Sequence, residues 1–259
     1  MTQLKVLETN ILHTSDVIYW LDGTTAETEA DMLRLNYPVE TTLTTRPSDL
    51  QLLHSAGKTA LWRRPTEPML EGAANESDLA FPTQTPFVLA GNVWDPDQRY
   101  NPRAFTITVG NVSRKALVLY PTPMGTRFGS SGGLTGTLRF DGSGLPVPWA
   151  ILTLVVTTAL GSQLTFHAQS NQHGDFALPM NRVPPLPEGI TQYSAELSIR
   201  ALSSADPATP IDPADLLVMN LGELTSNNVF SNPIGLAVVP GEMQLIRSMN
   251  RDHVAVQPS

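Results

Sequence analysis

The sequence predicts an all-β protein made of two β-sandwich-like domains and an extended C-terminal tail. The 22 prolines and 18 glycines divide the 259 residues into short segments. Most of these segments are rich in Val, Leu, Thr, Ile and Phe, which favour strands, while helical periodicity is scarce. We expect an N-terminal β-domain over residues 1–128, a β-sandwich over 129–205 and an extended tail over 206–259.

The first half is expected to contain seven strands. Residues 39–45 alternate between polar and apolar side chains, as does the run through Phe105, Ile107 and Val109, and this alternation is typical of half-buried strands. A stretch with four prolines, residues 64–86, is expected to be a surface excursion. The expected strands span residues 17–21, 39–45, 50–54, 59–63, 87–93, 105–109 and 116–120.

Two short helices are expected among these strands. Residues 24–35 form one candidate. Residues 212–220 form the other, because Asp212 is a favoured capping residue and Pro213 is tolerated at the first helical position. Between the two domains, residues 121–133 are rich in Gly, Ser and Pro, which indicates a linker or a long connection.

The second domain is predicted by turn residues and by alternation along its strands. Asp141 and Gly142, with Gly144, suit a tight hairpin, and Asn171 and Gly174 suit the next turn. Strand geometry places alternate side chains on one face. Ala150, Leu152 and Leu154 are expected to share a face, and the side chains expected to point inward are Phe176, Leu178, Tyr193, Ala195, Leu197 and Ile199.

Residues 133–201 resemble the carboxypeptidase regulatory-like domain, a transthyretin-like sandwich. The resemblance implies the fold and a non-catalytic accessory role; the zinc-binding elements of the parent carboxypeptidases are missing, so no peptidase activity is implied. The loop at 183–191 is longer than the family's usual turn, and residues 181–192 are therefore expected to project. The matching residues are Gly136, Asp141, Gly142, Pro146, Pro148, Ala150, Leu152, Leu154, Asn171, Gly174, Phe176, Leu178 and Pro179.

A second resemblance concerns the arrangement of the whole chain. Residues 91–109, followed by a strand at 116–120 and the sandwich, look like β-rich accessory proteins of contractile phage tails and related injection systems. This resemblance implies a structural role in a virion or other assembled particle, in several symmetric copies around a tail or baseplate.

Charge and composition exclude several classes of partner. Charged residues make up 15% of the chain, against about 25% in an average soluble protein. This favours a surface covered by neighbouring subunits, although a surface of Ser, Thr, Asn and Gln is an ordinary alternative. The formal net charge is −8, and no basic cluster exceeds Arg63 and Arg64, so nucleic-acid binding is not expected.

The chain is expected to be made in the cytoplasm. It has no cysteine, which favours a reducing compartment, and its first residues do not read as a signal peptide. The longest apolar stretch, residues 147–160, is interrupted by Pro148 and threonines. It is shorter than the roughly 20 residues that span a bilayer, so membrane insertion is not expected.

Two segments carry residues that could bind a metal, and each has a simpler interpretation. His167, His173 and Asp175 flank one turn, but a solvent-exposed turn histidine is the favoured interpretation. Residues 95–101 alternate oxygen ligands as calcium loops do, yet an Asp-Pro turn explains them without a metal. No nucleophile elbow, phosphate loop or dinucleotide motif is present, so we expect neither an enzyme nor a cofactor.

Four tryptophans suggest a carbohydrate-binding alternative, because sugars stack on exposed aromatic rings. Since tryptophan is usually highly buried, a core or interface position is the favoured interpretation of Trp94 and Trp149. The four are Trp20, Trp62, Trp94 and Trp149.

The sequence therefore predicts a non-enzymatic structural protein of a phage tail, baseplate or related contractile injection particle. It would act by strand addition and apolar contacts with other structural subunits, and deletion of residues 222–259 is expected to leave the sandwich folded. The alternative is a carbohydrate or cell-surface binding module that uses the aromatic side chains and the loop 181–192. The expected partner-contact residues are Ile234, Leu236, Val238, Val239, Met243, Leu245 and Ile246.

Overall fold

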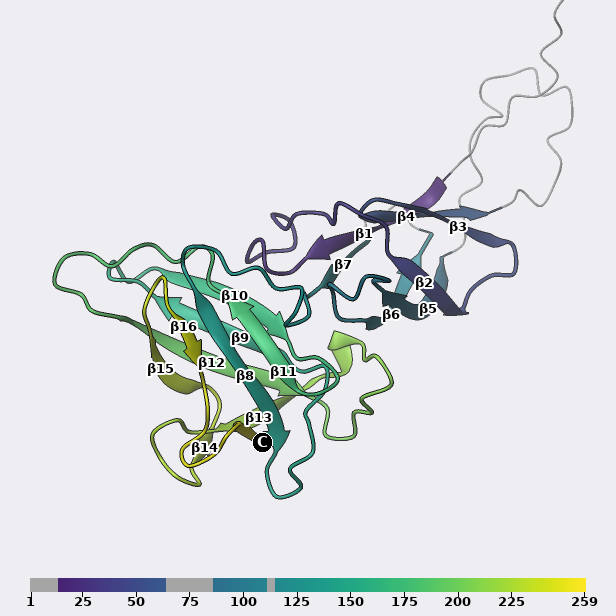
Figure 1. Cartoon of the computed structure of the whole chain (residues 1–259). Coiled ribbons are helices and arrows are strands. Elements are labelled where there is room, and N and C mark those ends of the chain that lie inside the picture. Colours follow the sequence, from purple (N-terminus) through teal and green to yellow (C-terminus); the bar gives the residue numbers. More distant parts are fainter. Residues whose placement is uncertain (1–13, 64–85, 111–114) are drawn as a thin grey trace, which may run out of the picture.

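The computed structural model describes residues 14–63, 86–110 and 115–259, and this part of the chain is an all-β protein. Two adjoining β-rich bodies follow one another along the chain (Figure 1). The described residues contain no helix that is long and apolar enough to cross a membrane. The surface excursion expected at 64–86 lies outside the described residues except for Pro86.

The N-terminal domain packs two sheets against each other. One sheet has the order β3-β4-β1-β7 and the other β2-β5-β6, and only the β1–β7 pair is parallel. Buried residues of both sheets, including Trp20, Leu61, Leu89 and Phe105, form one apolar core. The strands are β1 (Thr14–Asp22), β2 (Glu40–Thr45), β3 (Leu50–Ser55), β4 (Lys58–Arg63), β5 (Phe87–Trp94), β6 (Arg103–Val109) and β7 (Lys115–Leu119).

The C-terminal domain curves its strands around a second core. The path runs β10-β9-β12-β13-β17-β8-β11, and β10 lies beside β11, so the ends of the path approach each other. The shorter β14, β15 and β16 pair with β13, β12 and β8. The strands are β8 (Gly133–Phe140), β9 (Ile151–Thr157), β10 (Gln163–Gln169), β11 (Asp175–Pro179), β12 (Tyr193–Ala201), β13 (Leu217–Gly222), β14 (Phe230–Ser231), β15 (Ile234–Val238), β16 (Met243–Leu245) and β17 (Val254–Pro258).

The structure corrects the boundary expected at residue 205. Residues 206–259 are not a tail added to a finished sandwich, because β17 lies between β13 and β8 and closes the path of strands. Ile234, Val238, Val254 and Val256 are fully buried in the same core as the strands of 133–201. Deleting residues 222–259 would remove these four side chains and β17, so the deletion cannot leave this sandwich intact.

The expected strands of the first half are confirmed to within three residues at each end. The expected faces of the second domain are confirmed as well: Leu152 and Leu154 are buried on one face of β9, and Ala150, directly before that strand, is buried with them. The inward positions of β12 alternate with exposed ones, as the sequence predicts for a strand with one face on the core.

Neither expected helix forms as predicted. Residues 24–35 are irregular, because the segment returns to β1 and bonds there: Asp22 N donates to Leu33 O and Leu35 N to Trp20 O. In the second segment only a single 3₁₀ turn, η2 (Pro213–Asp215), follows the Asp212 cap, and β13 begins at Leu217. Pairing with β12 and β17 outweighs the local helix signal there.

The two domains meet through a shared apolar cluster and buried hydrogen bonds. Leu21 and Val118 of the first domain pack with Ile151 and Leu216 of the second. Asn101 Nδ2 also donates to Gln169 O over 3.1 Å at a buried position. The connection expected to be a linker, 121–133, takes part in this joint, since its backbone is hydrogen-bonded to both domains. The two sandwiches therefore form one continuous body.

Candidate functional site

A cleft of about 500 Å³ opens beside the joint between the domains. Its walls come from residues 22–25, 33–37 and 99–100 of the first domain, from the connection 121–127 and from Asn181 of the second domain. This volume lies within the range of small-molecule sites, roughly 300–1,000 Å³. The cleft is therefore the main candidate for a ligand site in the part of the chain that the structure describes.

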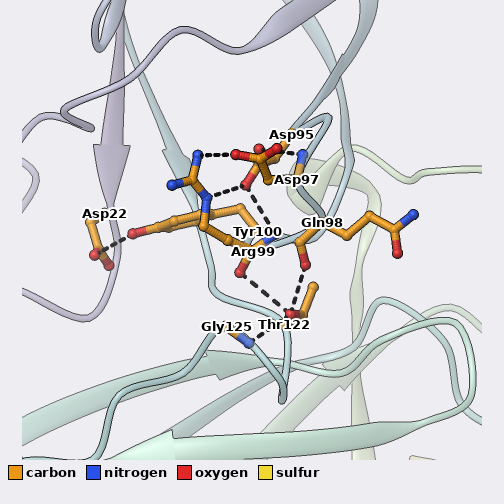
Figure 2. A network of polar contacts seen from close by, with 8 residues as sticks. All are labelled: Asp22, Asp95, Asp97, Gln98, Arg99, Tyr100, Thr122 and Gly125. Carbon is orange, nitrogen blue, oxygen red and sulfur yellow. Dashed lines mark hydrogen bonds and ion pairs between the residues drawn. The ribbon is translucent and has the colours of Figure 1, made fainter.

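One wall of the cleft is built on the turn that follows β5. The buried Asp95 carboxylate accepts hydrogen bonds from Asp97 N and Arg99 N, each over 3.0 Å, and these bonds fix the turn. Arg99 in turn forms ion pairs with Asp95 over 3.4 Å and Asp97 over 2.9 Å. Thr122 Oγ1 donates to Gln98 O over 3.0 Å and ties the connection to the same turn (Figure 2).

Two tyrosines and Asp22 continue the network across the cleft. The Arg99 guanidinium lies 3.6 Å from the centre of the Tyr37 ring, and Tyr37 and Tyr100 are 6.0 Å apart between ring centres. Tyr100 OH donates to Asp22 Oδ2 over 2.6 Å, as Figure 2 shows. Asp22 Oδ1 accepts from Thr24 N over 2.9 Å and from Thr24 Oγ1 over 2.7 Å.

Both tyrosines keep their protons at neutral pH. Burial raises the pKa of Tyr37 well above its ordinary value, and the nearby Asp95 carboxylate raises it further. Burial likewise raises the pKa of Tyr100, with Asp22 as the second cause. A tyrosine with a raised pKa is a poor base or nucleophile and serves as a hydrogen-bond donor. Neither tyrosine is therefore suited to act as a base, and the Tyr100 hydroxyl already donates to Asp22.

The expected partner-contact residues divide between the core and the surface. Ile234, Val238 and Ile246 are buried in the core of the second domain, so the prediction that they contact a partner is wrong. For Ile234 and Val238 the reason is that β15 pairs along β12 and turns its apolar face inward. Ile246 follows β16, where its backbone N donates to Thr135 O of β8. Leu236 and Val239 are half-buried.

Met243 and Leu245 remain exposed, at 50% and 57%. They stand two residues apart on β16 and therefore point to the same side of that strand. Within the described chain, β16 pairs with β8 and has no strand partner on its other side. Of the seven expected contacts, these two have the position that a contact with another chain requires.

The four tryptophans of the carbohydrate alternative differ in exposure. Trp20 and Trp149 are buried, and their indole nitrogens donate to Thr59 Oγ1 and Asp206 O. Trp62 is half-buried. Of the core or interface position favoured for Trp94, the core part is wrong, because Trp94 is 52% exposed at the end of β5.

The candidate metal ligands take ordinary structural positions. His167 Nδ1 lies 3.2 Å from Thr153 Oγ1 across the β9–β10 pair, and His173 is exposed in the turn. Asp175 Oδ1 accepts from Thr137 Oγ1 over 2.7 Å. Among the described residues, no group of three or more His, Cys, Asp or Glu side chains is placed to hold a metal ion.

Sequence reasoning found only part of the cleft. The Asp-Pro pair at residues 95–96 predicted a turn, and this turn is present. The other partners lie far along the chain: Asp22 is 78 residues from Tyr100. No local pattern joins such residues, because β-sheet pairing brings them together.

Comparisons with protein-family models, with curated proteins and with solved structures found no match.

Proposed function

We propose that this chain is a non-enzymatic structural subunit of a phage tail, baseplate or related contractile injection particle, which acts through contacts with other subunits. The observation that carries the proposal is the exposed apolar pair Met243 and Leu245 on β16, a strand with one unpaired side in the described chain. A strand with one unpaired side and exposed apolar side chains is suited to strand addition by a neighbouring subunit.

A contrasting edge supports this interpretation. On β10, Thr165 N donates to Glu27 Oε1 over 2.9 Å, and Arg182 Nη2 donates to Thr165 O. Glu27 and Arg182 also form an ion pair over 3.0 Å. These charged side chains occupy the backbone N–H and C=O of Thr165 at the edge of β10, and they oppose pairing of that edge with another chain. The part of β16 that carries Met243 and Leu245 has no such cover among the described residues.

The joint between the domains also supports a structural role. An accessory subunit must hold its contacts with different neighbours at fixed relative positions, and joined domains can do this. The resemblance of residues 133–201 to the carboxypeptidase regulatory-like domain favours the same role, since such modules serve as attachment units.

The test is incorporation into a particle. The tagged full chain is expressed in its natural host cells, and the cell lysate is fractionated on a density gradient. We expect the wild-type chain in the fast-sedimenting fractions and Leu245→Asp in the slow fractions, because a carboxylate in an apolar contact is costly. Leu160→Asp is the matched control, since Leu160 is 95% exposed in the turn after β9, and it should sediment like wild type.

Two results would contradict the proposal. One is a wild-type chain found entirely in the slow fractions. The other is Leu245→Asp sedimenting with the particle as efficiently as the control. Circular dichroism of each purified variant separates loss of contact from loss of fold.

The carbohydrate or cell-surface binding module remains the second candidate, and the exposure of Trp94 favours it. Binding of the purified chain to a glycan array, lost in Trp94→Ala without loss of stability, would support this function over the first.

A further inference from the structure

We infer that the cleft beside the domain joint is a binding site for a sugar acid, a hydroxyl-rich ring that carries a carboxylate. The inference goes beyond assembly and stands on the balance of hydrogen-bond donors and acceptors in the cleft. It does not depend on the contacts of β16.

Two side-chain acceptor groups that line the cleft, those of Asp22 and Asn181, already accept hydrogen bonds. Both oxygens of the Asp22 carboxylate accept bonds, from Thr24 and from Tyr100. The side-chain oxygen of Asn181 accepts from Gly129 N over 2.8 Å. A ligand that mainly donates hydrogen bonds would therefore compete at these two groups with donors of the protein.

The donors are in a different state. Arg34 and Arg127 line the cleft and are exposed, and their side chains form no ion pair or hydrogen bond with another described residue. The Arg34 guanidinium is held 5.4 Å from the centre of the Tyr19 ring, which limits its freedom. The Asn181 amide nitrogen is also without a partner among the described residues. Two unpaired cations beside neutral donors favour an anion that accepts hydrogen bonds.

Of the three arginines that line the cleft, only Arg34 and Arg127 are free to pair with a ligand. Arg99 is paired with Asp95 and Asp97, so that cluster keeps its own carboxylates occupied. Arginine binds carboxylates through parallel hydrogen bonds, and this geometry suits a ligand carboxylate held at the cleft mouth.

Size and apolar surface select a sugar acid over a bare anion. A cavity of about 500 Å³ is much larger than an inorganic ion. Leu33, which is 64% exposed, lines it and offers an apolar surface to the carbon face of a ring. Hydroxyl groups on the same ring can accept bonds from the Asn181 amide.

The experiment is titration calorimetry of the full chain with sodium glucuronate, glucose and sodium phosphate at one ionic strength. We expect saturable binding of glucuronate and binding at least about tenfold weaker for glucose and for phosphate. Arg127→Gln and Arg34→Gln should each weaken glucuronate binding roughly tenfold. Arg247→Gln, which changes an exposed arginine outside the cleft, should leave it unchanged.

Each other outcome overturns the inference. If glucuronate does not bind, the inference is wrong. If glucose binds as tightly as glucuronate, the carboxylate is not what the site recognises. Phosphate bound as well as glucuronate reduces the site to a general anion site. Glucuronate binding that survives both cleft variants places the ligand elsewhere. Leu245→Asp should bind glucuronate normally, so failure of assembly and failure of this site are distinguishable.

Discussion

At the scale of single residues, the bond between Tyr100 and Asp22 joins two distant parts of the first domain. Tyr100 OH donates over 2.6 Å to a carboxylate oxygen that has no other described donor. Removing the hydroxyl leaves a half-buried charge without that donor. Tyr100→Phe should therefore lower the free energy of unfolding by about 1–3 kcal/mol, measured by urea denaturation.

Tyr19→Phe is the matched control for this prediction. Tyr19 is also half-buried, but its hydroxyl forms no hydrogen bond with another described residue. Its loss should change the free energy of unfolding by less than about 0.5 kcal/mol. Equal urea midpoints for the two variants would show that the Tyr100–Asp22 bond contributes nothing.

A second residue, His167, should make stability depend on pH. Burial lowers the pKa of His167 below its ordinary 6.5, and the charges of Arg182 and Arg200 lower it further. The unfolded chain therefore takes up a proton at a pH where the folded chain does not. Stability should be constant above about pH 6.5 and fall as the pH is lowered from there toward the folded pKa.

His167→Gln should remove this part of the pH dependence. The measurement is the urea midpoint between about pH 7.5 and pH 5.5. His173→Gln, at an exposed position in the next turn, should retain the wild-type slope. A His167 variant whose midpoint falls as steeply as wild type would assign the effect to other groups.

At the scale of elements, the turn between β10 and β11 depends on a glycine in a left-handed conformation. Gly174 has φ +81°, and a Cβ there would overlap the carbonyl oxygen of Leu138. Gly142, in the turn after β8, has a similar φ of +80° but open space around it. The pair separates the cost of backbone conformation from the cost of a clash.

Gly142→Ala should cost about 1 kcal/mol, because only the conformational term applies. Gly174→Ala should cost about 3 kcal/mol or more, because β8 must also move. Thermal unfolding of the two purified variants checks the difference. Similar losses would mean that the turn relaxes around the added methyl group.

At the scale of the whole molecule, the joint between the domains should make them unfold together. Asp212 is central to it: Oδ2 accepts from Thr106 N over 3.0 Å, and Oδ1 lies 3.8 Å from Arg103 Nη2. The same Oδ1 accepts from Ala214 N and caps η2. The side chain of Arg103 is only 14% exposed, so removing its carboxylate partner leaves a nearly buried cation.

Asp212→Ala should lower stability by about 2–4 kcal/mol and split a single calorimetric transition into two. Asp215→Ala, three residues further on at an exposed position, should keep the single transition. A single transition in both variants would show that the apolar cluster alone couples the domains.

The strands could be predicted from the sequence because their signals are local. Alternation along β6 and β12, and turn residues such as Gly142 and Gly174, act within a few residues. The same local reasoning failed at residues 24–35, where backbone bonds to β1 replace a helix. It failed again at 234–246, where local apolar character did not distinguish a core strand from a contact surface.

The sequence by itself determined the fold class, the positions of most strands and the inward faces of the second domain. Only the tertiary structure decided that residues 206–259 complete that domain, and that Asp22, Tyr37, Arg99 and Arg127 line one cleft. The physical reason is the distance along the sequence over which each property is set. Strand propensity and turn conformation depend on near neighbours, whereas burial and cleft formation depend on which distant strands pair.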